Sequence, residues 1–89
     1  MLHKSISFLP HIMFQEFDHE SILLNINTQE HFGLDPVSTL FIKNIINGLT
    51  PLDACKVILK DYDVDEEQLH KDINELIESL VLKNLIEVS

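Results

Sequence analysis

Three helix-start signals follow one another in the second half of this sequence, and they constrain its fold more than any other feature. The signals are Asp35-Pro36, Thr50-Pro51, and Asp65 with Gln68 three residues later. Side-chain oxygens of Asp and Thr accept hydrogen bonds from the free N–H groups of a first helical turn, and proline is favoured at the first helical position. The sequence therefore predicts three consecutive helices. The first is expected to end at Asn47-Gly48 and the third at Asn84, because these residue types tolerate a left-handed backbone.

Each signal is followed by apolar residues at helical spacing. The first stripe contains Val37, Leu40, Phe41, Ile45 and Leu49, the second Leu52, Cys55, Ile58, Leu59 and Tyr62, and the third Leu69, Ile73, Leu76, Ile77 and Leu80. Each helix is thus expected to bury one face against a common core.

Before the helices, the sequence has short alternating segments that are typical of strands. Residues 6–8 and 12–15 flank Pro10, and we interpret them as one broken edge strand because proline cannot donate to a ladder. Ile22, Leu24 and Ile26 then occupy every second position, which is the period of a half-buried strand.

A third, short strand is expected from Glu30 to Leu34. Phe32 and Leu34 would share one face of it, and Gly33 between them would let another backbone approach closely. Together, the segments predict an α+β fold with three strands followed by three helices.

Composition bounds the class of protein. With 89 residues, the chain (1–89) has room for a single domain with one modest core. Its formal net charge of -9 repels the phosphate backbone that supplies most non-specific nucleic-acid affinity, so DNA or RNA is a poor partner. No stretch approaches the roughly 20 apolar residues of a membrane span, and we find no signal peptide. The sequence thus predicts a cytoplasmic protein without a membrane partner.

Candidate metal ligands are sparse. The histidines are His3, His11, His19, His31 and His70. None of them pairs with another histidine or with a cysteine at i, i+4 spacing, and no Cys-x-x-Cys motif could complete a zinc site. The aspartates at 61, 63 and 65 resemble the start of a calcium loop, but Glu66 stands where that loop needs glycine. No metal site is therefore predicted.

Signals of catalysis are sparse as well. Gly33 and Gly48 are the only glycines, so the sequence has no glycine-rich phosphate loop and predicts no cofactor. Cys55 lies on an apolar stripe, where free cysteine behaves as a small hydrophobe. We therefore expect a binding protein and not an enzyme. The unpaired N–H and C=O groups of a short edge strand are a template for adding another strand.

Several short motifs occur in a fixed order between Ser21 and Ile86. They are Phe32-Gly33-Leu34-Asp35 at a turn into a helix, Thr50, Ala54, Tyr62-Asp63-Val64, Asp72-Ile73, Leu76, Leu80 and Asn84-Leu85-Ile86. In this order they resemble the PqqD-like family. Its members are named for pyrroloquinoline quinone biosynthesis and are also called peptide recognition elements of ribosomally synthesised, post-translationally modified peptides. The Tyr-Asp-Val motif is most similar to stand-alone members in lasso-peptide pathways.

This resemblance implies a winged-helix-like fold, with a three-stranded antiparallel sheet followed by three helices. It also implies a non-catalytic function, in which the leader segment of a ribosomally made precursor peptide adds as an antiparallel strand to Glu30–Leu34. A leader peptidase and an ATP-dependent cyclase, both separate chains, would then receive the leader.

The resemblance also implies which residues would bind the peptide. They are Glu30, His31, Phe32, Gly33, Leu34, Ile73, Leu76, Ile77 and Leu80. Phe32 or His31 is expected to face the peptide, and the four residues of the third helix are expected to form side-chain pockets. Among these four, we favour Ile73 and Ile77 as pocket residues and Leu76 and Leu80 as core.

Three alternatives stay open. At Ile42, His31 and Asn84, lasso-pathway relatives often have tryptophan, tyrosine and glycine, which leaves room for a PqqD-like chaperone of another modified-peptide or pyrroloquinoline quinone pathway. A winged-helix transcription regulator has a similar helix order, but it needs a basic recognition helix, and the third helix here is rich in Glu and Asp. An oligomerising subunit or antitoxin could use the sheet edge to pair with its own copy.

Overall fold

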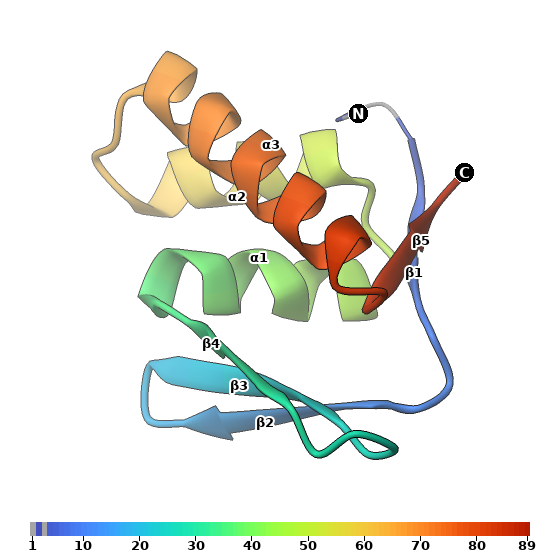
Figure 1. Cartoon of the computed structure of the whole chain (residues 1–89). Helices are drawn as coiled ribbons and strands as arrows, with labels where there is room; N and C mark the ends of the chain where they lie inside the picture. The colour runs from blue at the N-terminus through green and yellow to red at the C-terminus, as the bar shows by residue number, and fades with distance from the viewer. Residues whose placement is uncertain (1, 3) are drawn as a thin grey trace.

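The computed structural model of the chain describes residue 2 and residues 4–89. The strands are β1 (Ile6–Phe8), β2 (Ile12–Phe17), β3 (Glu20–Asn25), β4 (His31–Leu34) and β5 (Ile86–Val88), and the helices are α1 (Pro36–Ile46), α2 (Pro51–Asp61) and α3 (Glu66–Leu82). β2, β3 and β4 form an antiparallel sheet in that order. In Figure 1, α1 lies between this sheet and a layer formed by α2 and α3. The predicted α+β fold, three antiparallel strands followed by three helices, is confirmed.

All three predicted helix starts are confirmed by side-chain caps. Asp35, Thr50 and Asp65 each accept a hydrogen bond from the backbone N–H three residues later, at 2.8, 3.2 and 2.9 Å respectively. Each bond satisfies an N–H group that has no partner inside its helix. The caps therefore fix where each helix enters the core.

The predicted end of α3 at Asn84 is also confirmed. Asn84 has a φ of 59°. Its N–H donates to the carbonyl of Val81 at 3.0 Å, and the N–H of Leu85 donates to the carbonyl of Leu80 at 2.9 Å. This pair of bonds is a Schellman motif, which ends a helix and reverses the chain. The reversal directs β5 back along the molecule.

The interpretation of residues 6–8 and 12–15 as one broken strand is wrong. β1 pairs with β5, so that Ser7 lies opposite Glu87, whereas β2 pairs with β3 in the other sheet. The chain turns between β1 and β2, where the N–H of Ile12 donates to the carbonyl of Leu9 at 3.2 Å. The sequence pattern does not reveal β5, because its partner lies at the opposite end of the chain.

The half-buried character of β3 is confirmed, but its buried face is not the apolar series Ile22 and Leu24. The buried residues are Ser21, Leu23 and Asn25, which are 3%, 0% and 8% exposed. Ile22 and Leu24 are only half-buried, on the outer face of the sheet.

Ser21 tolerates burial because it has a hydrogen-bond partner. Its Oγ lies 2.7 Å from Oγ1 of Thr39 in α1. This bond joins the sheet to α1, and hydrophobic spacing alone does not reveal it.

One hydrophobic core connects the layers. The side chains with 0% exposure are Leu23, Phe41, Ile42, Ala54, Cys55, Ile58, Ile77 and Leu80. They come from β3 and from all three helices. The sheet and α3 are therefore held at a fixed distance by packing through α1.

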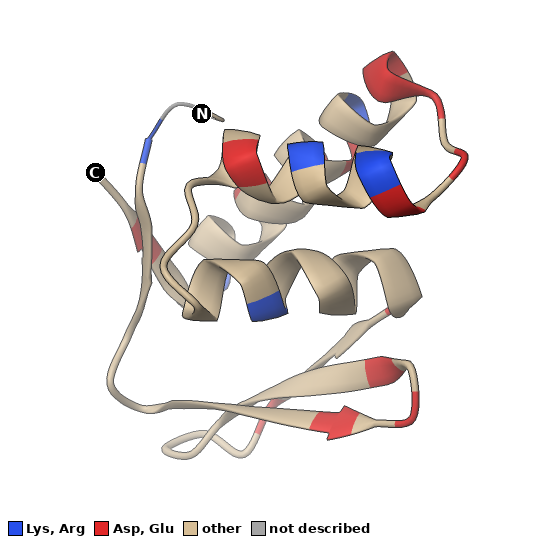
Figure 2. Ribbon diagram, turned by 180° about the vertical axis from the view of Figure 1, so that it is seen from behind, with Lys and Arg blue, Asp and Glu red and all other residues tan. Residues whose placement is uncertain are grey.

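Charge is distributed unevenly over the surface. Figure 2 shows acidic residues gathered at the loop from α2 to α3 and at the turn between β2 and β3. An ion pair between Lys43 Nζ and Glu16 Oε2, at 3.2 Å, joins α1 to β2.

Among the described residues, no helix has both the length and the apolar content that a bilayer crossing requires.

The left-handed backbone at Asn84 makes a stability prediction. We expect Asn84→Val to lower the free energy of unfolding by about 1–2 kcal/mol, because a β-branched residue is strained at positive φ. Asn84→Gly should leave stability equal or higher, because glycine adopts this conformation freely. Urea unfolding followed by circular dichroism measures both. Equal stability of the two variants would contradict the proposed role of this residue.

Candidate functional site

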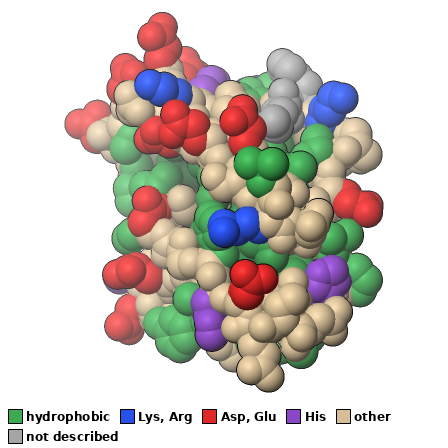
Figure 3. All heavy atoms as spheres, in the orientation of Figure 1, with side chains coloured by type: hydrophobic (Ala, Val, Ile, Leu, Met, Phe, Trp, Pro, Cys, Tyr) green, Lys and Arg blue, Asp and Glu red, His purple; other side chains and the backbone are tan. Residues whose placement is uncertain are grey.

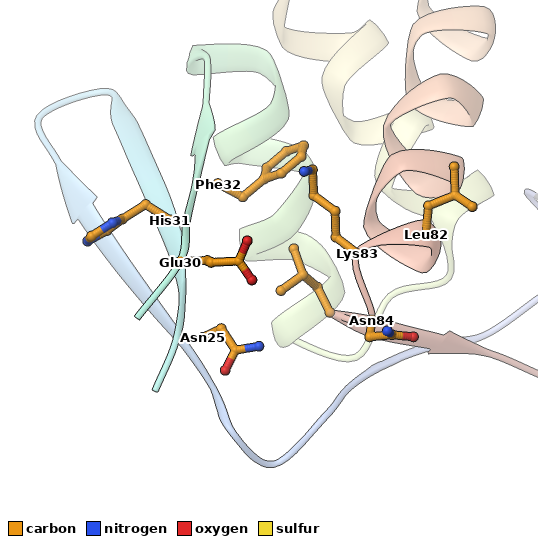
Figure 4. A pocket seen from close by; sticks show the side chains of 8 residues that line it. Asn25, Glu30, His31, Phe32, Leu82, Lys83 and Asn84 are labelled. Atoms are coloured by element: carbon orange, nitrogen blue, oxygen red, sulfur yellow. The ribbon is translucent and has the colours of Figure 1, made fainter. Parts of the chain in front are cut away.

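β4 is an edge strand. In the part of the chain that the structure describes, β3 is its only partner. An unpaired strand edge presents N–H and C=O groups that can bind a further strand. The opposite wall is α3, whose C-terminal end faces the start of β4 across a hollow (Figure 4).

The register of the sheet shows which main-chain groups of β4 are free. The N–H of Asn25 donates to the carbonyl of Glu30 at 2.9 Å. Hydrogen-bonded and non-hydrogen-bonded pairs alternate in an antiparallel ladder, so Phe32 is also hydrogen-bonded to β3, opposite Leu23. His31 and Gly33 lie between these pairs. Their N–H and C=O groups therefore point to the open edge.

The side chains of β4 alternate between the two faces of the sheet. Phe32 is half-buried against the core, and Lys83 Nζ lies 6.0 Å from the centre of its ring. His31 is exposed and points away from α3 in Figure 4. Of the two residues predicted to face the peptide, Phe32 is thus the one on the side of the hollow.

Gly33 has free space around it. A Cβ atom added there would meet no atom within 4 Å, and its backbone is not left-handed. No close approach within the chain requires glycine at this position. The open space lies on the outer face of the sheet, where Ile22 is the residue opposite Gly33.

The first of two hollows lies at the end of α3, and we call it the Lys83 hollow. Its volume is about 320 Å³. It is lined by Asn25, Glu30, His31, Phe32, Leu82, Lys83, Asn84 and Leu85. In Figure 4, the side chains of Glu30 and Lys83 point into it from opposite walls. The hollow therefore contains one negative and one positive side chain beside the apolar side chains of Phe32, Leu82 and Leu85.

The second hollow lies at the start of α3, and we call it the Asp72 hollow. Its volume is about 340 Å³. It is lined by Asp35, Val37, Ser38, Val64, Asp65, Gln68, Leu69, Asp72 and Ile73. Figure 3 shows acidic side chains gathered at the end of the molecule where α3 begins. Two of the three aspartates of this hollow are the caps of α1 and α3.

The preference for Ile73 and Ile77 as pocket residues is not supported by their burial. Ile77 and Leu80 are 0% exposed and belong to the core, and Ile73, at 1%, touches only the Asp72 hollow. Leu76 is half-buried and packs against the core from its rim. Of the two residues favoured as core, Leu80 is fully buried and Leu76 has free surface, because helical spacing does not tell which edge of a broad stripe is covered.

Other chemistry is weak in the described residues. Burial raises the pKa of the Cys55 thiol to about 11, so the thiolate that a nucleophile needs is scarce at neutral pH. In residues 2 and 4–89, no three His, Cys, Asp or Glu side chains group as metal ligands. His3 lies outside the described residues.

Asn25 and Lys83 line the site but escape sequence reasoning. Asn25 is buried, with 8% of its surface exposed, although its position in an alternating segment favours an exposed polar residue. Lys83 directly precedes the helix-ending Asn84, so its place at the mouth of a hollow depends on where α3 stops. Only the position of the Schellman motif could have indicated this role.

The small α+β fold and the open strand beside α3 define a compact binding module. Comparison with protein families agrees: the family described as coenzyme PQQ synthesis protein D (PqqD) matches residues 20–86. The chain belongs to the PqqD family. A comparison with curated proteins found no significant match.

Two solved structures are similar to this chain. The structure of TbiB1 in complex with the TbiA(beta) leader peptide is 26% identical, has a TM-score of 0.83, and covers 91% of this chain and 94% of that chain. The structure of a lasso peptide synthetase B1 complexed with the leader peptide is 22% identical, has a TM-score of 0.82, and covers 93% of this chain and 98% of that chain. At its lower identity, the second likeness shows the fold alone.

The burial of α3 predicts different roles for two adjacent residues. Ile77→Ala should lower the free energy of unfolding by about 2–5 kcal/mol, because it leaves a cavity in the core. Leu76→Ala should cost clearly less, since part of that side chain is already exposed. Chemical unfolding of both variants under one set of conditions tests the assignment. A larger loss for Leu76→Ala would show that the rim and the core are assigned the wrong way round.

Proposed function

We propose that this protein binds the leader segment of a ribosomally made precursor peptide and delivers it to separate maturation enzymes, in lasso-peptide biosynthesis. The leader adds to β4 as an antiparallel strand, along the open edge at His31 and Gly33. The peptide-binding residues are Glu30–Leu34 and, on α3, Leu76 with its neighbours Ile73, Ile77 and Leu80 behind it.

The open edge of β4 is the observation that carries this proposal. Its free N–H and C=O groups match the main chain of any extended peptide. The Lys83 hollow and the Asp72 hollow lie at the two ends of α3, where side chains of an added strand could enter. Main-chain bonds would supply affinity, and the hollows would supply sequence preference.

Similarity to the two complexes supports the same proposal. Each of those proteins is bound to a leader peptide. The chain matches nearly the whole length of both.

A non-catalytic role fits the chemistry of the site. The groups that line the two hollows are carboxylates, amides, one hydroxyl, one ammonium group, one imidazole and apolar side chains. The buried thiol of Cys55 lies in the core. The maturation steps are assigned to partners, a leader peptidase and an ATP-dependent cyclase.

A DNA-binding role is disfavoured by α3. Within Glu66–Leu82, Lys71 is the only Lys or Arg, against five acidic residues. A recognition helix with this charge would repel phosphate groups.

Proline at the free edge tests strand addition. We expect His31→Pro to weaken peptide binding about tenfold or more, because it removes an edge N–H and leaves a peptide carbonyl unpaired. The probe is the tightest binder selected from an mRNA-displayed library of random peptides. Calorimetry measures its affinity for each variant.

Two matched variants separate the edge from the fold. His31→Ala keeps the N–H and should bind like the wild type. Phe32→Pro removes an N–H that bonds to β3, so it should lower the melting temperature, whereas His31→Pro should not. Unchanged affinity of a folded His31→Pro protein would reject strand addition, as would a library that yields no binder to the wild type.

The delivery role makes a separate prediction. The purified protein alone should leave a precursor unchanged, and it should accelerate cleavage by the leader peptidase when both are present, because it raises the local concentration of substrate. Mass spectrometry of the precursor follows both reactions. Modification by this protein alone would refute the non-catalytic role.

A further inference from the structure

Asn25 presents a hydrogen-bond donor to the Lys83 hollow without using it. The residue is 8% exposed. Its Oδ1 accepts from the N–H groups of Asn27 at 3.0 Å and Thr28 at 3.2 Å. These two bonds identify the oxygen of the amide, so the other atom is the nitrogen.

The nitrogen of this amide faces the hollow. Figure 4 shows Asn25 on the sheet wall with its nitrogen directed towards the α3 side. No described residue accepts a hydrogen bond from it. The hollow thus contains a donor for which the protein itself offers no acceptor.

Glu30 and Lys83 complete the polar lining. Both side chains point into the hollow in Figure 4, and neither takes part in an ion pair among the described residues, where Lys43 and Glu16 form the one such pair. The hollow therefore offers an amide donor, a carboxylate acceptor and an ammonium donor, beside the ring of Phe32.

The register of an added strand places one peptide side chain here. Glu30 and Phe32 are two residues apart, so their side chains lie on the same face, the face towards α3. A peptide residue opposite Glu30 would project to that face as well. This step rests on the proposed strand addition to β4.

We propose that the Lys83 hollow selects a neutral peptide side chain that both accepts and donates hydrogen bonds, a carboxamide or a hydroxyl. Its oxygen accepts from Asn25 Nδ2, and its N–H or O–H donates to the carboxylate of Glu30. Asn25 and Glu30 are thereby specificity-determining residues.

Other side chains fit the hollow less well. A carboxylate would lie beside the charge of Glu30, and an ammonium group would lie beside Lys83 and the donor of Asn25. An aliphatic side chain would cover the amide of Asn25 and leave it unpaired, which a site built for hydrogen bonding rejects strongly.

Asn25→Asp is the sharpest test, because it keeps the oxygen that Asn27 and Thr28 bond and replaces only the free donor by an acceptor. Asn27→Asp is the matched control, since it adds the same charge in the same turn at an exposed position. Glu30→Gln is a second variant at an exposed residue, so the test stands even if Asn25→Asp unfolds.

The probe is the library-selected peptide, with each position replaced in turn by Gln, Thr, Leu, Glu and Lys. At one position, the wild type should prefer Gln or Thr over the other three by about tenfold. Asn25→Asp should change the preference at that position to Lys, and Glu30→Gln should change it to Glu. Asn27→Asp should keep the wild-type order.

The outcomes separate this inference from the proposed function. If the wild type and both variants share one order of preference at every position, the hollow does not select the side chain, and strand addition still stands on the His31→Pro result. If His31→Pro leaves affinity unchanged while Asn25→Asp alters it, strand addition is wrong and the hollow binds the peptide in another way.

Discussion

The alternation of hydrogen bonds along β3 is the constraint on which the candidate site depends. β3 has partners on both sides, so successive residues direct their main-chain groups first to β4 and then to β2. Because Asn25 bonds to Glu30, Phe32 must also face β3, and His31 and Gly33 must face outward. No side chain of the site decides this. A one-residue change in the register between β3 and β4 would exchange the two sets, so that His31 and Gly33 would bond to β3 and Phe32 would face outward.

The core determines the second wall in a similar way. Ile77 and Leu80 anchor α3 among residues from β3, α1 and α2, and the Schellman motif at Asn84 decides where α3 stops. Lys83 reaches the ring of Phe32 because the helix ends there. The hollow at this end is therefore a product of a helix cap and a strand start that are far apart in the sequence.

Much of the fold could be predicted because it depends on local interactions. The caps at Asp35, Thr50 and Asp65 are each formed within three residues, and the turn at Asn84 within five. All residues that form such a cap or turn are close together in the sequence, so a short segment is enough to predict it. The helices and the open strand at Phe32 follow from them and from alternation.

The errors concern interactions between distant segments. β1 finds its partner at the other end of the chain, and the sequence around Pro10 cannot show this. The buried face of β3 contains Ser21 because Thr39 bonds to it, so the energetic cost of burial is offset by a residue in another element. The burial of Ile77, at 0% exposure, could not be read from the sequence either, because an apolar stripe does not show what covers each of its edges.

An open edge also creates a hazard, because a copy of the same strand could pair with it. The strand is short, four residues from His31 to Leu34, which limits the number of bonds that self-pairing could form.

Each copy also has a net charge of -9, so two copies repel one another as they approach. That repulsion is screened beyond about 8 Å at physiological salt, but Glu30 adds a negative charge directly beside the edge. A peptide strand without this charge meets no such barrier. The same acidity that disfavours nucleic acid therefore favours a separate peptide over a second copy at β4. It favours basic peptides in the rate of encounter more than in final affinity.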